Sequence, residues 1–158
     1  MEKAIATVIL TVAGITAILA VINAFMPAIS RTSGSLVASA DSVDSRISTH
    51  VEIIHAAGSD GSATVETWTK NVGAINIAPV ERVDIFFGTA DNFLRIPYGG
   101  PSCTAPCWDY TIENDSIWNP TATLRVTLTL DYTLSAGNTY YIKVVAPNGI
   151  SDARFFTV

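Results

Sequence analysis

The most constraining feature of the sequence is an N-terminal segment that carries no charge. No Asp, Glu, Lys or Arg occurs from Ala4 to Ser30, and most residues in this segment are apolar. A run of about 18 or more apolar residues without charge is typical of a helix that crosses a membrane. The rest of the chain is long enough for one small domain with its own core, since such domains begin at about 50 residues.

The apolar segment is expected to belong to a longer helix. After Pro27, which should kink the helix, apolar residues recur at near-helical spacing. They are Ile29, Leu36, Val37, Ala40, Val43 and Ile47. The pattern predicts one helix from about residue 2 to about residue 50, roughly 70 Å long. A membrane anchor needs only about 20 residues, so this helix must have another task, surrounded by lipid or by copies of itself.

The remainder of the chain reads as β-structure. Short segments of β-branched and aromatic residues alternate with turns rich in Gly, Pro and Asn. The expected strands are 51–56, 64–70, 83–87, 124–130, 140–145 and 154–158. The predicted fold class is therefore α+β, with a hydrophobic helix over 1–50 and an antiparallel, immunoglobulin-like β-sandwich over 51–158. The stretch 92–120 contains four prolines and is expected to be an irregular excursion on the surface.

Two cysteines occur close together, Cys103 and Cys107. In an exported protein two neighbouring cysteines most simply form a disulfide. Half of a metal site is the alternative, but the only two histidines, His50 and His55, are far away in the sequence. The sequence thus favours a disulfide, and it predicts neither a metal site nor a cofactor. So short a loop would constrain local geometry more than it would stabilise the fold.

Charge and motif content argue against nucleic-acid binding and against catalysis. The net charge is −5 and the pI is about 4.8, whereas nucleic-acid binding requires a basic surface. Gly99-Gly100 is not followed by the Lys-Ser/Thr of a phosphate-binding loop. No catalytic group of residues is evident, and the chain is predicted not to be an enzyme. Charged residues make up only 15% of the chain, which suggests that neighbouring subunits cover much of the surface.

Two acidic clusters are weak candidates for cation binding. Asp41 and Asp44 lie one helical turn apart with Arg46 nearby, and a solvated helix face explains them better than a cation site or an intersubunit ion pair. The acidic residues between Asp109 and Asp115 do not have the spacing of a calcium loop.

Asn114 is a candidate for glycosylation because Asn114-Asp115-Ser116 is the one Asn-X-Ser/Thr sequence without a central proline. Trp68, Trp108 and Trp118 are expected to anchor the core and loops, since a carbohydrate platform would require them to be coplanar on one exposed face.

Several motifs together resemble one family. They are the charged tip Glu2-Lys3 before IATVILTVAGITAILAVINAF, WTKNVG at 68–73, VDIFFG at 83–88, KVVAPNG at 143–149 and FFTV at 155–158. In this order they resemble archaeal flagellins (archaellins), the filament subunits of the archaellum, and the related type IV pilin-like proteins. The resemblance covers nearly the whole chain.

The resemblance implies a structural subunit of an extracellular motility filament. It implies a precursor held in the cytoplasmic membrane, then a helical homopolymer whose base meets motor proteins. The N-terminal helix would form the filament core, with small residues such as Ala13, Ala17 and Ala20 allowing close packing. The residues assigned to polymerisation are Ile5, Val8, Ile9, Val12, Gly14, Ile15, Ile18, Leu19, Ile22 and Phe25.

Three features of the sequence bear on these expectations. Archaellins are made with a short basic leader, yet only Met1-Glu2-Lys3 precedes the apolar run. The mature end is therefore expected at Met1 or after cleavage near Lys3-Ala4. Bacterial type IV pilins usually carry Glu at the fifth mature position, where this chain has Ile5, which favours the archaellin side. The cysteine pair is uncommon in archaellins.

The alternatives are an envelope-anchored stator or accessory protein of the archaellum, which shares the plan of helix and sandwich, and an adhesive type IV pilin. A membrane-tethered binding domain or enzyme would differ by retaining its activity without the helix.

Overall fold

The computed structural model describes residues 2–158, so the expected mature end at Met1 lies outside the described residues. The chain divides into two compact units, one up to Ser42 and one from Val43 to Val158. Residues 2–158 contain one α-helix, α1 (Glu2–Ser48), which runs through the first unit and ends in the second.

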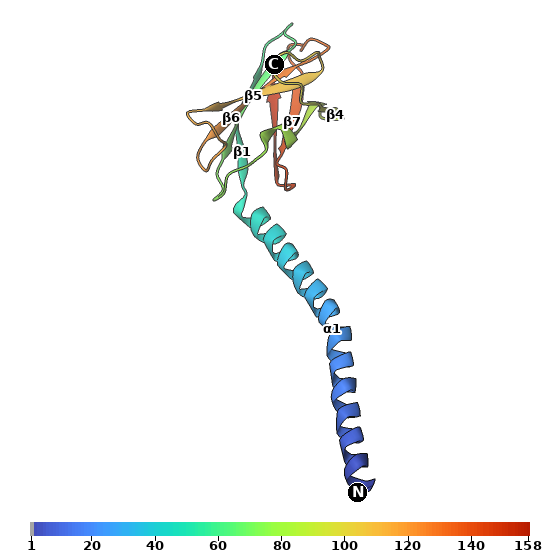
Figure 1. The fold of residues 1–158 in the computed structure, drawn as a ribbon. Coiled ribbons are helices and arrows are strands. Elements are labelled where there is room, and N and C mark those ends of the chain that lie inside the picture. Colours follow the sequence, from blue (N-terminus) through green and yellow to red (C-terminus); the bar gives the residue numbers. More distant parts are fainter. Residues whose placement is uncertain (1) are drawn as a thin grey trace. The chain divides into compact units, whose positions relative to one another are not determined.

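Helix α1 is continuous through the apolar segment, with Pro27 inside it. Its ribbon changes direction about midway along its length (Figure 1). Threonine hydroxyls in the helix donate to backbone carbonyls one turn earlier: Thr7 to Lys3 at 2.8 Å and Thr32 to Ala28 at 3.0 Å. These bonds satisfy polar groups that an apolar environment would otherwise leave unpaired.

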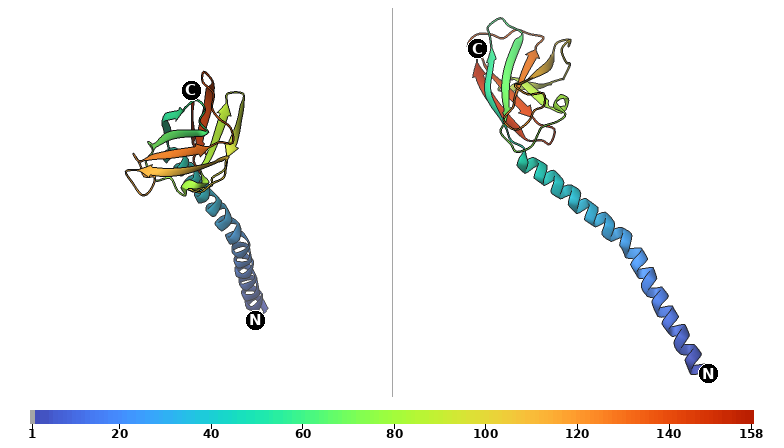
Figure 2. Two further views of the ribbon diagram at one scale, coloured as in Figure 1. Left: turned by 90° about the horizontal axis from the view of Figure 1, so that it is seen from above. Right: turned by 60° about the vertical axis from the view of Figure 1, so that its left-hand side comes forward.

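The second unit is a sandwich of two antiparallel sheets with four strands each (Figures 1 and 2). The first sheet has the order β1-β2-β6-β5 and the second β4-β3-β7-β8. The predicted fold class, a long N-terminal helix followed by an antiparallel sandwich, is confirmed. The strands are β1 (Val51–Gly58), β2 (Thr64–Asn71), β3 (Asp84–Thr89), β4 (Asn92–Ile96), β5 (Cys107–Glu113), β6 (Thr123–Thr129), β7 (Thr139–Val145) and β8 (Ser151–Thr157).

Alternation along the strands builds the core. In β6, Leu124, Val126 and Leu128 are fully buried between the sheets, while the residues between them lie on the outer face. In β7, Ile142 and Val144 do the same. This period of two is what a sheet requires when one of its faces is buried.

The prediction of an irregular surface excursion over 92–120 was wrong. The segment contains β4 and β5, and its two tryptophans, Trp108 and Trp118, are 1% and 0% exposed. Pro97, Pro101 and Pro106 lie between the two strands, where no ladder needs their missing N–H groups. The prolines therefore mark a connection between strands, and the residues on either side of it contribute to the core.

Candidate functional site

The residues that the sequence assigns to polymerisation line a helix surface that is open to solvent in this structure. The exposed fractions of their apolar side chains range from 51% at Ile22 to 63% at Ile9. A Cβ placed on Gly14 would meet no atom within 4 Å. By length and composition the helix could cross a membrane. Since burial of a large aliphatic side chain is worth about 1.5–3 kcal/mol, this surface requires an apolar partner.

The apolar surface of α1 continues past the length of a membrane span. Leu36 is 67% exposed, Val43 is 55% exposed and Ile47 is 78% exposed. Between them lie polar and charged residues, among them Asp41 and Asp44, which are themselves exposed. The second half of the helix is thus amphipathic, where the first half is apolar on all sides.

The last turn of α1 is held by backbone contacts with the loop after β2. The backbone N–H of Ala74 donates to the carbonyl of Ser48 at 2.8 Å, and that of Val72 donates to the carbonyl of His50 at 2.9 Å. Gly73 lies between them, and a Cβ there would come within 2.6 Å of both Ser48 O and His50 N. A helix C-terminus leaves four carbonyls without partners, and this loop supplies one.

A second contact comes from the turn between β7 and β8. The amide of Asn148 donates to the carbonyl of Ser45 at 3.1 Å and to the hydroxyl of Thr49 at 2.7 Å. Thr49 is buried and donates in turn to Ser45 O at 2.7 Å. The end of the helix therefore shares hydrogen bonds with two separate loops of the sandwich, and sequence analysis did not predict either.

Asn71 organises the loop that reaches the helix. Its side chain is fully buried and donates to the carbonyls of Ile75 at 2.8 Å and Trp118 at 3.1 Å, while its oxygen accepts the N–H of Gly73 at 3.0 Å. A buried amide with three partners is a strong constraint on backbone path. In the sequence Asn71 appeared only as part of the WTKNVG motif at 68–73, which gave no indication of this role.

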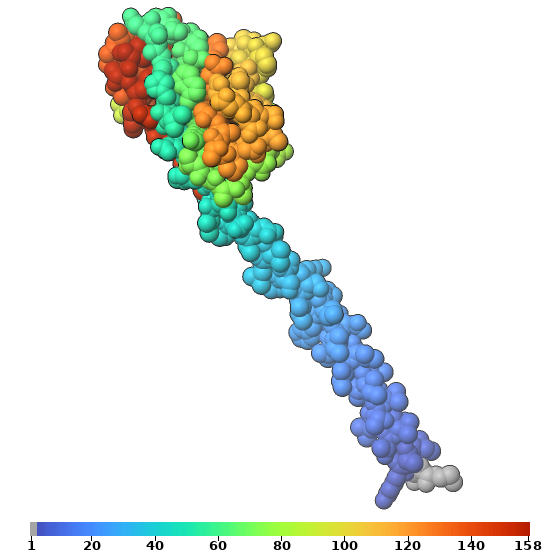
Figure 3. Space-filling view, turned by 90° about the vertical axis from the view of Figure 1, so that its left-hand side faces the viewer, coloured from blue at the N-terminus to red at the C-terminus, as the bar shows by residue number. Residues whose placement is uncertain are grey.

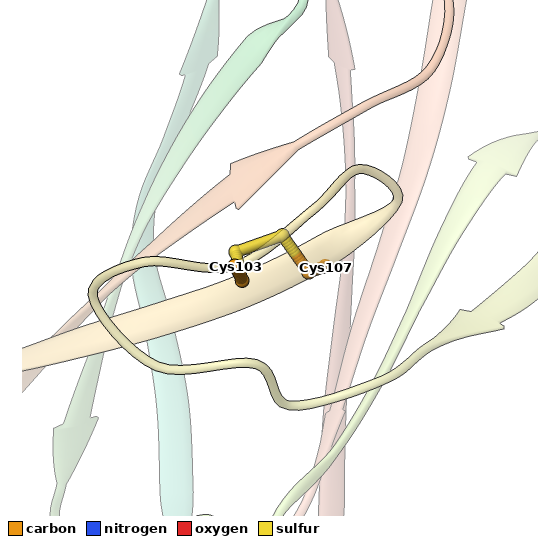
Figure 4. Close-up of a disulfide and its surroundings, with 2 residues drawn as sticks. All are labelled: Cys103 and Cys107. Atoms are coloured by element: carbon orange, nitrogen blue, oxygen red, sulfur yellow. A yellow bond between two sulfur atoms is a disulfide. The ribbon is translucent and has the colours of Figure 1, made fainter.

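The cysteines form a disulfide at the start of β5, with 6.1 Å between their Cα atoms (Figure 4). The loop that they close follows a segment paired with β5 through a parallel bridge between Tyr98 and Trp108. The rings of these two residues lie 4.8 Å apart. The disulfide therefore constrains the loop that covers the edge of β5.

Asn114 lies in the exposed turn after β5, with a positive φ of 62°. Next to it the Asp115 carboxylate accepts hydrogen bonds from the Asn119 amide at 2.9 Å and the Ser116 N–H at 2.7 Å. These bonds, that of Asn119 first, lower the pKa of Asp115. Asn114 is accessible to a modifying enzyme in this turn, and its glycosylation stays a prediction.

Within residues 2–158, no three His, Cys, Asp or Glu side chains come together as metal ligands would. Three acidic residues of the sandwich lie near arginines. On the outer face of the first sheet Arg125 lies 3.1 Å from Glu113 and 3.9 Å from Glu66. On the second sheet Arg95 pairs with Asp84 at 2.6 Å.

Comparison with known proteins gives a family match over most of the chain. A family model described as archaeal-type flagellin matches residues 2–154. An uncharacterised protein of Archaeoglobus fulgidus is 26% identical over 164 aligned residues, which cover 99% of this chain and 98% of that protein.

One solved structure resembles the chain over nearly its whole length, and two others resemble about two thirds of it. The archaeal flagellum of Methanospirillum hungatei strain JF1 matches 99% of this chain and 92% of its own, with a TM-score of 0.65 and 16% identity. The archaellum periplasmic stator protein FlaG of Sulfolobus acidocaldarius matches 68% of this chain and 99% of its own, with a TM-score of 0.60 and 24% identity. A chain of the archaellum periplasmic stator protein complex FlaF and FlaG of the same organism gives a TM-score of 0.59 and 24% identity, over 67% of this chain and 87% of its own. At these identities the likeness concerns the fold.

Proposed function

The chain belongs to the archaeal-type flagellin family, and we propose that it is a structural subunit of an archaellum-type surface filament that polymerises through α1. The family is one of structural proteins of the archaellum, and membership supports a role for the chain at the cell surface in motility. The filament role itself is the proposal.

The observation that carries the proposal is the length of the exposed apolar surface on α1. The helix has 47 residues, and exposed apolar side chains occur from Ile5 to Ile47. A bilayer core about 30 Å thick covers only about 20 helical residues. Lipid could therefore cover one half of this surface, whereas a bundle of identical helices could cover all of it.

Assembly would transfer the helix from lipid to such a bundle. Residues from about Ala4 to Ile22 would lie in the membrane before assembly. Lipid and bundle are about equally apolar, so the transfer alone contributes little, and close packing of small residues such as Ala13 and Gly14 supplies the attraction. Contacts repeated between successive copies are heterologous and extend into a helical lattice, which leaves the sandwiches at the outer surface.

The fold match to FlaG supports a second candidate, an envelope-anchored stator protein. That match covers nearly all of the FlaG chain and is limited to about two thirds of this one. In this role the first half of α1 would anchor the protein in the cytoplasmic membrane at low copy number, and the sandwich would contact other envelope proteins. An adhesive pilin would instead form filaments without a motor.

Electron microscopy of material sheared from cells that express the full chain separates these candidates. We expect filaments, and mass spectrometry should identify this chain as their main component and locate its mature N-terminus. An envelope component present in few copies, with no filaments, would support the stator role instead.

Variants of the helix test the packing. Gly14→Leu widens the helix and Ile15→Asp adds a charge to its apolar surface, so both should reduce filament yield by more than about tenfold, the effect of 1.4 kcal/mol. The matched control is Ile54→Asp, which places the same charge at an exposed apolar position of the sandwich. Normal filaments from both helix variants would disprove packing through α1.

A further inference from the structure

The two sheets have four edge strands between them: β1 and β5 in the first sheet, and β4 and β8 in the second. An edge strand presents unpaired backbone N–H and C=O groups, which can pair with another chain unless the protein covers them. The way in which each edge is covered differs in this sandwich.

The edges of β1 and β8 lie beside each other, and side chains of β8 bond to the backbone of β1. The Asp152 carboxylate of β8 accepts the N–H of Ile53 at 2.7 Å, and the Arg154 guanidinium donates to the carbonyl of Ile53 at 2.8 Å and that of Ile54 at 3.1 Å. In the space-filling view the red surface of β8 lies directly beside the teal surface of β1 (Figure 3). Side chains of one edge thus occupy backbone groups of the other.

The edge of β5 is covered by chain from the preceding loop. The N–H of Trp108 donates to the carbonyl of Pro97 at 3.0 Å, and the N–H of Gly99 donates to the carbonyl of Trp108 at 3.1 Å. The Cys103–Cys107 disulfide closes this loop next to the strand (Figure 4).

The edge of β4 has no such cover. Among the described residues, the backbone groups of Asn92–Ile96 form hydrogen bonds with β3 alone, in the ladder and from the Thr89 hydroxyl to the Asn92 carbonyl at 3.4 Å. The strand also exposes two large apolar side chains on opposite faces, Phe93 at 45% and Leu94 at 69%. Natural edge strands are usually protected by charge, and here Arg95 alone provides it.

On the outer face of the second sheet, β4 begins a row of aromatic rings. Phe93 lies opposite Gly88 of β3. Because Gly88 has no side chain, the Phe93 ring reaches across it to the ring of Tyr141 on β7, at 4.9 Å between the ring centres. Tyr141 continues to Phe155 of β8 at 5.0 Å, which is 57% exposed. An antiparallel sandwich normally has a polar outer face, so this row is an apolar surface that reaches the open edge.

On the inner side of β4 lies a hollow of about 400 Å³. Its lining includes Leu94 and Ile96 of β4, the core rings of Phe87 and Tyr140, and the half-exposed ring of Tyr132. A strand added beside β4 would place alternate side chains over the aromatic row and over this hollow, which is the pattern of recognition by strand addition.

We propose that β4 pairs antiparallel with β4 of a second copy of this chain, in the register centred on Leu94. The pairing would join two four-stranded sheets into one of eight strands. It places Leu94 opposite Leu94 of the second copy, above the two hollows. It also places Phe93 opposite Arg95 of the second copy, twice by symmetry.

The sequence of β4 supports a second copy as the occupant because it is complementary to itself. Phe93 and Arg95 are on the same face and equidistant from Leu94. Each Arg95 guanidinium, which is also paired with Asp84 of its own chain, therefore meets a ring of the second copy, an attractive pair at close range. A register centred on Arg95 would instead place two like charges opposite each other, which is destabilising. Such a contact is isologous and closes on itself. The inference therefore goes beyond the proposed filament contacts, which are heterologous.

Cysteine cross-linking of the full chain in detergent micelles, with micelles in excess over protein, tests the register. Cys103 and Cys107 are bonded to each other, and no free cysteine occurs in residues 2–158. Directly opposite residues of an antiparallel pair have Cβ atoms about 4.5–5.5 Å apart. Leu94→Cys should therefore give a covalent dimer that reductant reverses. The control is Ile117→Cys, at a position of the sandwich where the native side chain is 47% exposed, and this variant should stay monomeric.

Two substitutions of opposite charge at Phe93 test whether the strand beside β4 belongs to a second copy of this chain. Phe93→Lys puts two lysines opposite the arginines of the second copy and should weaken dimerisation about tenfold or more, whereas Phe93→Glu creates two ion pairs and should preserve it. No cross-link at residue 94, equal cross-linking at 94 and 117, or equal weakening by both Phe93 variants would overturn the proposal. These readouts do not depend on whether filaments form, so they remain distinct from the test of the filament role.

Discussion

The hydroxyl of Tyr110 donates a hydrogen bond of 2.7 Å to the carboxylate of Glu81, which lies in the short 3₁₀ helix Val80–Arg82. This bond is the main reason that the pKa of Tyr110 is raised to about 12 and that the pKa of Glu81 is lowered. The bond joins β5 to the loop before β3, two segments that are distant in the sequence. Neither residue belongs to a motif, which is why sequence analysis gave no reason to pair them.

This pair predicts a specific dependence on pH. Folded Tyr110 keeps its proton up to about 12, while in the unfolded chain it loses the proton near its ordinary pKa of 10.0. The free energy of unfolding should therefore fall as the pH rises between these values. For Glu81, whose folded pKa is lowered, the contribution is present above its ordinary pKa and is lost as the pH falls through the folded value.

Ultraviolet titration of tyrosinate is the measurement. One of the five tyrosines should titrate at about 12, and Tyr110→Phe should remove that step. Glu81→Gln should move it toward the ordinary value, because the partner charge is gone. As a control, Tyr132→Phe should leave the step in place. If the step persists in Tyr110→Phe, the assignment is wrong.

At the scale of elements, the strands with strict alternation were predictable and those in the proline-rich segment were not. β2, β6 and β7 follow the period of two closely, so their existence could be read from the residues. β4 is short and mostly exposed, and β5 begins with two adjacent buried residues, Cys107 and Trp108. Burial there depends on the disulfide loop and the tertiary environment, which a local pattern cannot supply.

The contact between the loop after β2 and the end of α1 predicts a contrast between two glycines. Gly73→Ala would press a methyl group against the backbone of Ser48 and His50, so it should lower the free energy of unfolding by about 1–3 kcal/mol. Gly34→Ala in α1 meets no atom within 4 Å and should be neutral or raise helix stability by up to about 1 kcal/mol. Urea unfolding followed by tryptophan emission measures both. Equal effects would mean that the junction tolerates displacement.

At the scale of the molecule, the boundary between the two compact units lies within α1, after Ser42. The sequence predicted the helix and the sandwich as separate parts, and the structure places the last turn of the helix with the sandwich. That turn could not be assigned from its residues, because its partners, Asn148 and Ala74, are remote in the chain. The assignment of 1–50 to a filament core and 51–158 to an outer domain stays a prediction.

Two truncated chains test this boundary. A chain that begins at Val43 keeps the hydrogen bonds of Ser45, Ser48 and Thr49 and should unfold cooperatively. A chain that begins at Val51 loses them and should be less stable by about 2–4 kcal/mol, at about 1 kcal/mol for each bond lost. Urea unfolding of the two proteins gives the comparison. Equal stability would show that the last turn contributes nothing to the sandwich.

The hydrogen bonds at the end of α1 also have a mechanical consequence. Asn148 and Ala74, from two different loops, donate hydrogen bonds to the carbonyls of Ser45 and Ser48 at the end of the helix. A force applied along the helix axis would therefore be divided between the β7–β8 turn and the Asn71 loop, and each loop leads into a different sheet. If the covalent connection between α1 and β1 carried the whole load, the hydrogen bonds of β1 would break one after another from its end. When the load is shared in this way, several bonds must break at once, so this junction should resist tension better than its few residues suggest.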